Sequence, residues 1–571
     1  MHTGNYIISG GNESVMVQWQ LDTGRKQFLP HLSSPICNIV VSPSGNSYAI
    51  KLADNSVMVL SARELLARAT LTGLQASSKE TWSWDRHDQA TCQRVGVAAV
   101  LHPKQPDRLL IAVPARQQNG GDMRKAAISP VLQTYDIRTD CHISRQALTR
   151  TNTTTLTVNP EGGEITAPDI QYLDVSNCGK WLATVDAWRP NPDDLRSLEP
   201  NSTSGEIDHF QEVYLKFWGW NSTSGLWELV TRIDAPHFSE RGPVTVLGLS
   251  AQPHGKGFAT IGRDAVLRLW YPITRQRSGA KAADAHQRLE TWRCQSSIDL
   301  KGCTGGIDAG GLEAACMAFS EDGSVLAICL QAHSIPAQSI TLLVDIQAGQ
   351  PCHSRSGLFS GVPHAVRFLG KCLIIASDSS LSIWDTVDDS VRAVGSSELD
   401  IDISVERSLK LLAVDCKART FAVAAQNSPD HTGKRRRRSR FHVQVRSLDS
   451  LALVYDAALR NPPVSLLLDS FSGNYIVVDT AASVRRIGNL DDKNSKATAQ
   501  YRELSVNVSL GLAGLLGSHS GYAGHASRLG MEEAEDTAQP HKQLATIFDG
   551  APSYSLPSVS VLFRDVVKSL V

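Results

Sequence analysis

Features that would place this chain in a membrane or outside the cell are missing from its sequence. No run among its 571 residues approaches the ~18 consecutive apolar residues that a transmembrane helix needs. The first residues, MHTGNYIISGG, lack the basic segment and apolar core of a secretory signal. The 11 cysteines are odd in number, scatter from Cys37 to Cys416 and include no Cys-x-x-Cys pair, so they do not make a disulfide framework. We therefore expect a reducing compartment, either the cytosol or the nucleus.

The sequence also lacks an excess of charge of either sign. Lys and Arg total 56 and Asp and Glu total 57, which leaves a formal net charge of −1. This balance argues against a protein that binds nucleic acid or an acidic membrane over its whole surface, but it allows a local basic patch. With 42% hydrophobic and 20% charged residues, the composition is that of a globular chain.

Signatures of enzymes are missing as well. The chain has no P-loop, no His-Glu-x-x-His zinc motif and no nucleophile elbow, since GSHSG at 517–521 has His where the elbow has Ser. HGKGFATIG at 254–262 superficially resembles a Gly-rich phosphate loop, but its glycine spacing differs and it lies in a strand–turn–strand unit, so we interpret it as a hairpin turn. We expect a non-enzymatic protein without cofactor, metal or small-molecule substrate.

What the sequence does contain is a repeat of short strands. An apolar strand runs into Ser-Pro-x-Gly or a related turn and a second strand follows, which predicts a hairpin. The clearest copies are at 40–50, 173–185 and 317–330, and looser copies are at 366–377 and 466–478. The third strand of each unit supplies a marker position, and the markers are Trp19, Leu60, Tyr135, Trp218, Trp270, Val344, Trp384, Arg446 and Ile487. Their shortest spacings, 40 and 41 residues, match the period of about 40–45 residues of WD40 blades.

This pattern predicts an all-β fold, a WD40-type β-propeller with a short helical tail at the C-terminus. Nine markers exceed the usual four to eight blades of one ring, whereas the last seven make one complete seven-bladed ring. We therefore assign 75–490 to a seven-bladed propeller and 1–74 to the last two blades of a preceding propeller whose beginning is absent. Residues 491–571 are interpreted as a polar, Gly- and Ser-rich linker followed by the tail.

The tail is predicted from the segment LPSVSVLFRDVVKSLV at 556–571. Pro557 and Ser558 form a helix-start signal, and apolar residues then recur at helical spacing. The candidate partner-binding residues of this stripe are Leu562, Phe563, Val566, Val567 and Leu570. Because so short a helix has little core of its own, it either folds back onto the propeller or docks on a partner.

One charged segment stands out: GKRRRRSR at 433–440 carries six basic residues in seven. These residues are Lys434, Arg435, Arg436, Arg437, Arg438 and Arg440. The run lies between two strands of one predicted blade, so we expect an exposed loop. It is open to three interpretations: a solvated loop, a nuclear-import signal, or an electrostatic contact to the phosphate backbone of RNA. No aromatic residue interrupts the run, which disfavours base-specific readout.

Several other residues of types found in active sites are predicted to have structural roles. His237 and His364 precede predicted blade strands, where WD repeats often place a structural histidine. Asp264 and Asp378 lie in tight turns, where carboxylates cap backbone N–H groups. The tryptophans at marker positions, Trp19 among them, are expected to pack between neighbouring blades rather than to stack on bases.

The segment from Thr3 to Asn46 is more distinctive than a general WD repeat. Its characteristic residues are Ser9, Gly10, Gly11, Glu13, Ser14, Val17, Trp19, Phe28, Leu29, Pro30 and Leu32. With them the chain resembles the WD-repeat subunit of the t-UTP (UTP-A) subcomplex of the small-subunit processome, a family in which an "LSGG-ES-V-W" blade is followed by "FLPRL". The segment ATIFDGAPSYSLPSVSVLF at 545–563 also looks like the C-terminal end of that family. The blades between these two ends fit the family by their order and spacing.

The resemblance implies two tandem propellers with a helical tail, acting as a non-enzymatic scaffold of ribosome biogenesis in the nucleus and nucleolus. Such proteins bind the 5′ external transcribed spacer of pre-rRNA within a complex, help recruit the U3 small nucleolar ribonucleoprotein, and are linked to rRNA transcription. The expected partners are other t-UTP subunits, with the spacer and U3 small nucleolar RNA contacted directly or indirectly. No membrane partner is expected.

Two other functions stay open on the sequence. A cytoplasmic interaction scaffold, such as a ubiquitin-ligase substrate receptor or a trafficking-coat subunit, would use the same blades but leaves the basic run and the opening segment unexplained. A propeller enzyme would need acidic residues that converge at the central channel, and the sequence shows no nucleophile–base constellation.

Overall fold

The structure is a computed structural model. It describes residues 5–11, 14–29, 32, 34–75, 79–84, 90–113, 131–150, 168–188, 211–240, 242–275, 289–303, 311–332, 339–377, 380–394, 411–426 and 441–488. These residues form β-strands and one 3-10 turn at Lys301–Cys303, with no α-helix among them. In this part of the chain no helix has the length and apolarity needed to span a bilayer.

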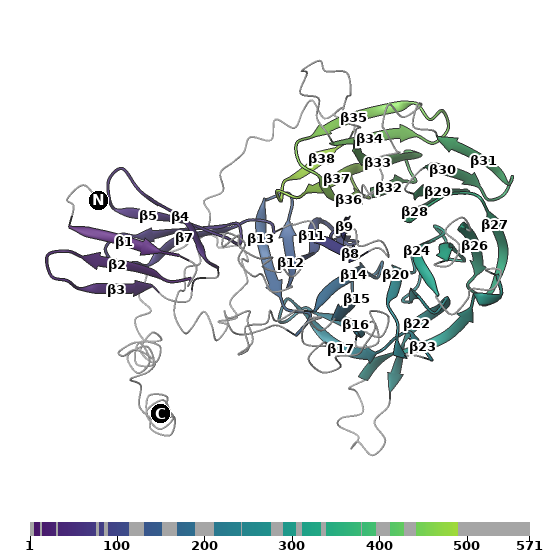
Figure 1. The fold of residues 1–571 in the computed structure, drawn as a ribbon, viewed down its shortest axis with the longest axis horizontal. Coiled ribbons are helices and arrows are strands. Elements are labelled where there is room, and N and C mark those ends of the chain that lie inside the picture. Colours follow the sequence, from purple (N-terminus) through teal and green to yellow (C-terminus); the bar gives the residue numbers. More distant parts are fainter. Residues whose placement is uncertain are drawn as a thin grey trace, which may run out of the picture.

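Seven antiparallel sheets make up the main body of the molecule (Figure 1). The strands of each sheet are hydrogen-bonded in chain order, so each sheet is an up-and-down meander. The first three sheets are β10 (Ala99–His102), β11 (Gln105–Val113), β12 (Val131–Asp136) and β13 (Cys141–Gln146); β14 (Asp169–Val175), β15 (Trp181–Trp188), β16 (Glu212–Asn221) and β17 (Leu226–Asp234); and β20 (Val246–Ala251), β21 (Phe258–Gly262), β22 (Val266–Arg275) and β23 (Leu289–Asp299).

The other four sheets follow the same order. They are β24 (Leu312–Phe319), β25 (Val325–Ala332), β26 (Ser339–Asp345) and β27 (Gln350–Ser356); β28 (Pro363–Leu369), β29 (Cys372–Ser377), β30 (Leu381–Asp385) and β31 (Ser390–Val394); β32 (Leu411–Asp415), β33 (Thr420–Gln426), β34 (Phe441–Ser447) and β35 (Leu453–Leu459); and the three-stranded β36 (Pro463–Asp469), β37 (Asn474–Asp479) and β38 (Val484–Ile487).

The seven sheets close into a ring. The first strand of each sheet contacts the first strand of the next, and β36 contacts β10. At this closure the N–H of Val97 donates to the carbonyl of Val464 at 3.1 Å. The guanidinium of Arg486 lies 3.1 Å from the carboxylate of Asp107, and Leu109 packs with Val464 in one buried apolar cluster. The predicted β-propeller is therefore confirmed.

The hairpins predicted from the repeated turn clusters are present in the structure. The five predicted segments correspond to the antiparallel pairs β4–β5, β14–β15, β24–β25, β28–β29 and β36–β37. In the turn between β24 and β25, the hydroxyl of Ser320 accepts a hydrogen bond from the N–H of Val325 at 3.0 Å. Gly323 in the same turn has φ +73°, a left-handed conformation that side chains disfavour. The markers from Leu60 to Ile487 all lie in the third strand of their sheets.

Two further sheets precede the ring. One contains β1 (Tyr6–Gly10), β2 (Met16–Gln20) and β3 (Lys26–Leu29), and the other contains β4 (Ile36–Val41), β5 (Ser47–Leu52), β6 (Ser56–Ser61) and β7 (Ala67–Thr72). Met16 of the first sheet packs against Tyr48 and Ile50 of the second in a buried cluster. We call this pair the N-terminal sheets; it is the purple part of Figure 1.

The N-terminal sheets contact the first sheet of the ring. The carboxylate of Asp54, in the turn before β6, lies 3.0 Å from the guanidinium of Arg145 in β13. The side-chain amide of Gln133 in β12 donates to the carbonyl of Gly73 at 2.9 Å, and its oxygen accepts from the N–H of Gln75 at 2.8 Å. These polar contacts fix the N-terminal sheets beside β12 and β13.

The remaining strands form two short pairs, β8 (Lys79–Trp84) with β9 (Ala90–Val95) and β18 (Phe238–Ser239) with β19 (Gly242–Pro243). The predicted domain boundaries 1–74, 75–490 and 491–571 stay predictions. The predicted tail helix lies outside the described residues.

Most of the strand ends that anchor the long polar insertions lie at one face of the ring. Antiparallel order places the connections after second and fourth strands at one face and those after first and third strands at the other. The connections that carry 114–130, 189–210 and 427–440 follow second strands, and those that carry 151–167 and 395–410 follow fourth strands. The strand ends that anchor the basic run at 434–440 therefore lie at the same face as those of the other insertions, whereas the anchors of 276–288 lie at the opposite face.

Candidate functional site

The two sites predicted from the sequence lie outside the described residues. These are the basic run from Lys434 to Arg440 and the tail stripe from Leu562 to Leu570. The strands that flank the basic run are described, and Gln426 of β33 pairs with Phe441 of β34. The run therefore connects neighbouring strands of one sheet, as predicted, and both sites stay predictions.

The histidine and aspartate of the third ring sheet form a buried structural cluster. His237 Nδ1 lies 2.9 Å from the carboxylate of Asp264, and His237 Nε2 lies 2.9 Å from the hydroxyl of Thr260. The same hydroxyl accepts a hydrogen bond from the indole N–H of Trp270 at 2.9 Å. Asp264 also accepts from the N–H of Val266, so the predicted capping role is confirmed. The cluster joins the connection before β20 to the sheet. Because the His237 side chain is fully buried, a substrate cannot reach it.

The other residues with predicted structural roles differ in outcome. HGKGFATIG at 254–262 forms the turn before β21 and the strand itself, so the hairpin interpretation is confirmed. Trp218, Trp270 and Trp384 are buried as predicted. His364 lies half-buried in β28, and Asp378 lies outside the described residues.

The prediction that Trp19 packs between blades is wrong. Its side chain is 36% exposed, and it lies opposite Ile7, which is 52% exposed. Its indole N–H donates to the Ser9 hydroxyl at 3.0 Å, and the Lys26 ammonium lies 4.3 Å from its ring centre. The reason is that Trp19 lies on the face of β2 opposite Met16, and Met16 faces the second N-terminal sheet.

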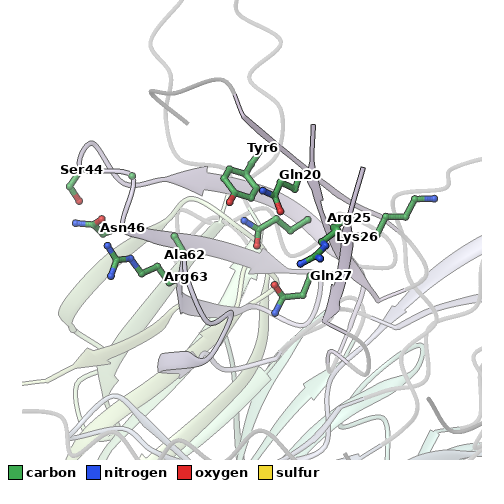
Figure 2. Close-up of a pocket in the computed structure, with 11 residues that line it drawn as sticks. Tyr6, Gln20, Arg25, Lys26, Gln27, Ser44, Asn46, Ala62 and Arg63 are labelled. Atoms are coloured by element: carbon green, nitrogen blue, oxygen red, sulfur yellow. The ribbon is translucent and has the colours of Figure 1, made fainter. Parts of the chain in front are cut away.

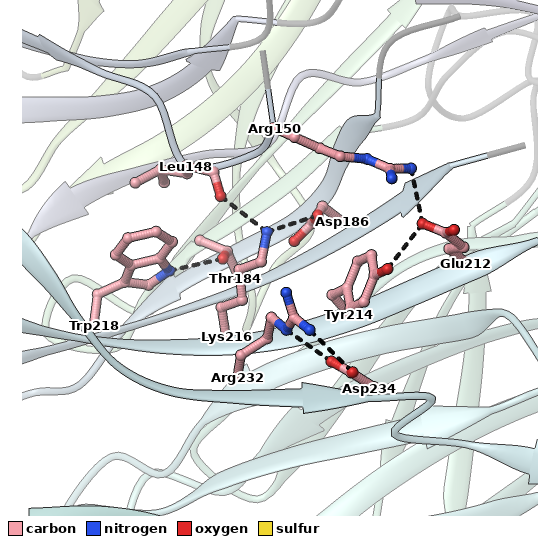
Figure 3. A network of polar contacts seen from close by, with 10 residues as sticks. All are labelled: Leu148, Arg150, Thr184, Asp186, Glu212, Tyr214, Lys216, Trp218, Arg232 and Asp234. Atoms are coloured by element: carbon pink, nitrogen blue, oxygen red, sulfur yellow. Dashed lines mark hydrogen bonds and ion pairs between the residues drawn. The ribbon is translucent and has the colours of Figure 1, made fainter.

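A buried ion pair organises the second ring sheet (Figure 3). The Lys216 ammonium lies 2.8 Å from Asp186 and donates to the carbonyl of Leu148 at 3.0 Å, and both charged side chains are less than 10% exposed. Burial raises the pKa of Asp186 above its ordinary value, although the Lys216 charge opposes this. Beside the pair, the indole N–H of Trp218 donates to the Thr184 hydroxyl at 3.0 Å.

The outer half of this network is more exposed. The Tyr214 hydroxyl donates to Glu212 at 2.8 Å, and Arg150 approaches the same carboxylate at 2.8 Å (Figure 3). Arg232 pairs with Asp234 at 2.8 Å. Each cation thus has a carboxylate partner, and the contacts of Glu212 and Lys216 tie β16 to the connection at 148–150. It is a structural network, because no cation in it is left for a ligand.

A cationic crevice lies between the N-terminal sheets (Figure 2). Its volume is about 750 Å³. One wall comes from β1, the end of β2 and the start of β3, and the other comes from the turns that follow β4 and β6. The lining residues are Tyr6, Gln18, Gln20, Arg25, Lys26, Gln27, Ser44, Gly45, Asn46, Ala62 and Arg63. We call it the basic crevice.

The charges of the basic crevice are of one sign. Arg25 and Arg63 are exposed and stand on opposite walls, whereas Lys26 also contacts the Trp19 ring. None of the described residues that line the crevice is a carboxylate, although Asp22 and Glu64 occupy the same two turns. Among the described residues no ion pair joins Arg25 or Arg63 to an acidic side chain. Two arginines thus line one crevice, and within the described residues neither has an acidic partner.

Sequence reasoning missed the basic crevice. Arg25 and Arg63 are 38 positions apart; Arg25 has one basic neighbour, Lys26, and Arg63 is followed by Glu64, so neither lies in a long basic run. The only available signal was that both follow a predicted third strand, Trp19 and Leu60 being its markers. In the part of the chain that the structure describes, no group of three or more His, Cys, Asp or Glu side chains could hold a metal ion.

Comparisons with known proteins identify sequence relatives of this chain. No family model matches this chain. U3 small nucleolar RNA-associated protein 17 of Schizosaccharomyces pombe is 29% identical over 272 residues, and NET1-associated nuclear protein 1 of Saccharomyces cerevisiae is 26% identical over 300 residues. Each match covers 47% of this chain. WD repeat-containing protein 75 of Homo sapiens is 23% identical over 335 residues, which cover 58% of this chain.

The matches cover only part of these relatives, 31% of the length of each. A chain from a solved structure, "Crystal Structure of Mitotic Checkpoint Complex", has a TM-score of 0.40 and 10% identity, with 69% of this chain and 89% of that chain covered. So low a score carries no argument about function. The predicted resemblance rests on the sequence relatives, which confirm it: the chain is a homologue of WD-repeat proteins that include U3 small nucleolar RNA-associated protein 17 and WD repeat-containing protein 75.

Proposed function

We propose that the chain is a WD-repeat scaffold of ribosome biogenesis that acts in the t-UTP subcomplex of the small-subunit processome, on the 5′ external transcribed spacer of pre-rRNA. The observation that carries this proposal is the match to a protein named for its association with U3 small nucleolar RNA, which extends over 47% of the chain. The name of a second relative includes "nuclear protein", which supports a nuclear and nucleolar location.

The geometry supports a binding role rather than catalysis. The buried polar clusters of the described residues, His237–Asp264 and Lys216–Asp186, are closed by partners within the protein. No nucleophile with an adjacent base opens into a pocket among those residues. A propeller of this kind presents broad faces and edges to other macromolecules, and we propose that the chain is not an enzyme and needs no cofactor.

The proposed partners are other t-UTP subunits, together with the 5′ spacer and U3 small nucleolar RNA, directly or through those subunits. The basic run from Lys434 to Arg440 would serve nuclear import or contact RNA phosphates, and the tail stripe around Phe563 would dock on a partner. The anchors of the basic run lie at the insertion-rich face of the ring, which makes that face the proposed assembly side.

Affinity purification from nuclear extract, with and without RNase, tests this function. Mass spectrometry and RNA sequencing of the bound fraction should recover other t-UTP subunits together with U3 and 5′-spacer RNA. Subunits that persist after RNase would show that protein contacts suffice for assembly. Recovery of ubiquitin-ligase or coat subunits without pre-rRNA would instead establish the cytoplasmic scaffold and refute the proposal.

A further inference from the structure

We propose that the basic crevice between the N-terminal sheets is a binding site for single-stranded RNA. The two arginines hold backbone phosphates, and Tyr6 stacks on a base. The choice of RNA among polyanions rests on the proposed function, whereas the affinity for a polyanion rests on the crevice itself.

The first argument is electrostatic. Arg25 and Arg63 line the crevice from its two walls, and no carboxylate belongs to the described lining (Figure 2). Two like charges around a common space repel each other, and an anion between them removes that repulsion. A guanidinium also matches a phosphate group with two parallel hydrogen bonds, which makes arginine the favoured residue for such contacts.

The second argument concerns the uncharged lining. Tyr6 is 36% exposed at the crevice and pairs across the sheet with Gln20, so its ring stands beside a side-chain amide. Gln27 and Asn46 add further amides to the lining (Figure 2). Amides both donate and accept hydrogen bonds, as base edges do, and an aromatic ring gives any base a stacking surface. A peptide of acidic residues alone would use the arginines, but it has no flat ring to stack on Tyr6.

The third argument is size. The volume of about 750 Å³ lies within the range of ~300–1,000 Å³ that ligand pockets span. A crevice between two sheet ends admits an unpaired strand with its bases turned inward. A duplex keeps its bases stacked inside and could offer only phosphates, so single-stranded RNA uses more of this lining.

Fluorescence anisotropy on the purified full chain tests the proposal. The probe is a fluorescein-labelled twelve-nucleotide single-stranded RNA, measured across a salt series. Because the basic run at 434–440 could also bind RNA, each variant is measured in the natural chain and in a chain whose Lys434, Arg435, Arg436, Arg437, Arg438 and Arg440 are all replaced by glutamine.

The double variant Arg25→Gln/Arg63→Gln should weaken binding about tenfold or more in the background without the basic run. The slope of log affinity against log salt should fall by about 1.4, since each lost phosphate contact to a single strand removes about 0.7. Tyr6→Leu should weaken binding roughly fivefold or more and leave that slope unchanged, because stacking releases no counterions. The matched control is Arg138→Gln, an exposed arginine in the turn between β12 and β13 of the ring.

Unchanged affinity and slope for the double variant in both backgrounds would overturn the proposal. A glutamate-rich or phosphorylated peptide that binds at the crevice more tightly than RNA would overturn it as well. Far-ultraviolet circular dichroism of every variant separates loss of binding from loss of fold. A separate result would refute the proposed function alone: the natural chain recovers no pre-rRNA from nuclear extract, while the purified chain still binds RNA through the crevice.

Discussion

Replacing Lys216 by methionine removes the cation that lies at hydrogen-bond distance from the buried carboxylate of Asp186. The methionine side chain keeps the apolar stem in place, so the main loss is charge. The Asp186 side chain is 2% exposed and cannot recover its hydration, and the carbonyl of Leu148 loses its donor. Removal of one partner from such a buried pair costs about 3–5 kcal/mol.

Thermal unfolding by circular dichroism measures this loss. The unfolding entropy is about 2.1 cal/mol/K per residue, and the ring has roughly 280 described residues, so a loss of about 4 kcal/mol lowers Tm by about 7 °C. Lys180→Met is the matched control, because Lys180 pairs with Glu290 at 3.0 Å with side chains 57% and 35% exposed. An exposed pair contributes at most about 1 kcal/mol, so the control should change Tm by less than about 2 °C.

The pH dependence of the Lys216→Met variant gives a second measurement. Burial already raises the pKa of Asp186, and the loss of Lys216 raises that pKa further. Between the ordinary pKa of aspartate and this raised value the folded state binds more protons than the unfolded state, so stability falls as pH rises. The variant should therefore lose less stability relative to the natural chain at pH 5 than at pH 7. A Tm equal to that of the Lys180→Met control, or a loss independent of pH, would refute this reasoning.

Three further predictions follow from other parts of the chain. His237→Ala should lower the unfolding free energy by about 2–4 kcal/mol in urea titrations, because it leaves Asp264 and the Thr260 hydroxyl without their buried partner; equal stability would contradict the closed cluster. Leu109→Ala at the ring closure should cost about 2–5 kcal/mol in the same assay, since this side chain is fully buried between the first and last sheets, and a loss below about 1 kcal/mol would mean that the closure is loosely packed. Phe563→Asp should reduce co-purification of partners while the Tm of the propeller stays the same, and normal co-purification would show that the tail stripe does not dock.

The repeat of strands and turns could be predicted from the sequence because its causes are local. Glycine at a left-handed turn position, a serine that caps the turn, and apolar runs on both sides predict a hairpin without knowledge of the rest of the chain, as at Gly323. The spacing of Trp270, Trp384 and the other markers then indicated how many sheets follow one another. The structural roles of His237 and Asp264 could also be predicted from their local sequence. His237 precedes a predicted strand, and Asp264 lies in a tight turn.

The exposure of Trp19 and the existence of the basic crevice depended on tertiary structure. A tryptophan in a marker position is buried only where another sheet covers its face, and the sequence of β2 carries no information about that neighbour. Arg25 and Arg63 are 38 positions apart in the sequence, and they share a cavity only because their two sheets pack face to face. The sequence by itself determined the repeated hairpins and the number of marker strands, since these follow from interactions between residues close in the chain. Only the tertiary structure decided which side chains meet, because the packing of whole sheets brings distant turns to one place.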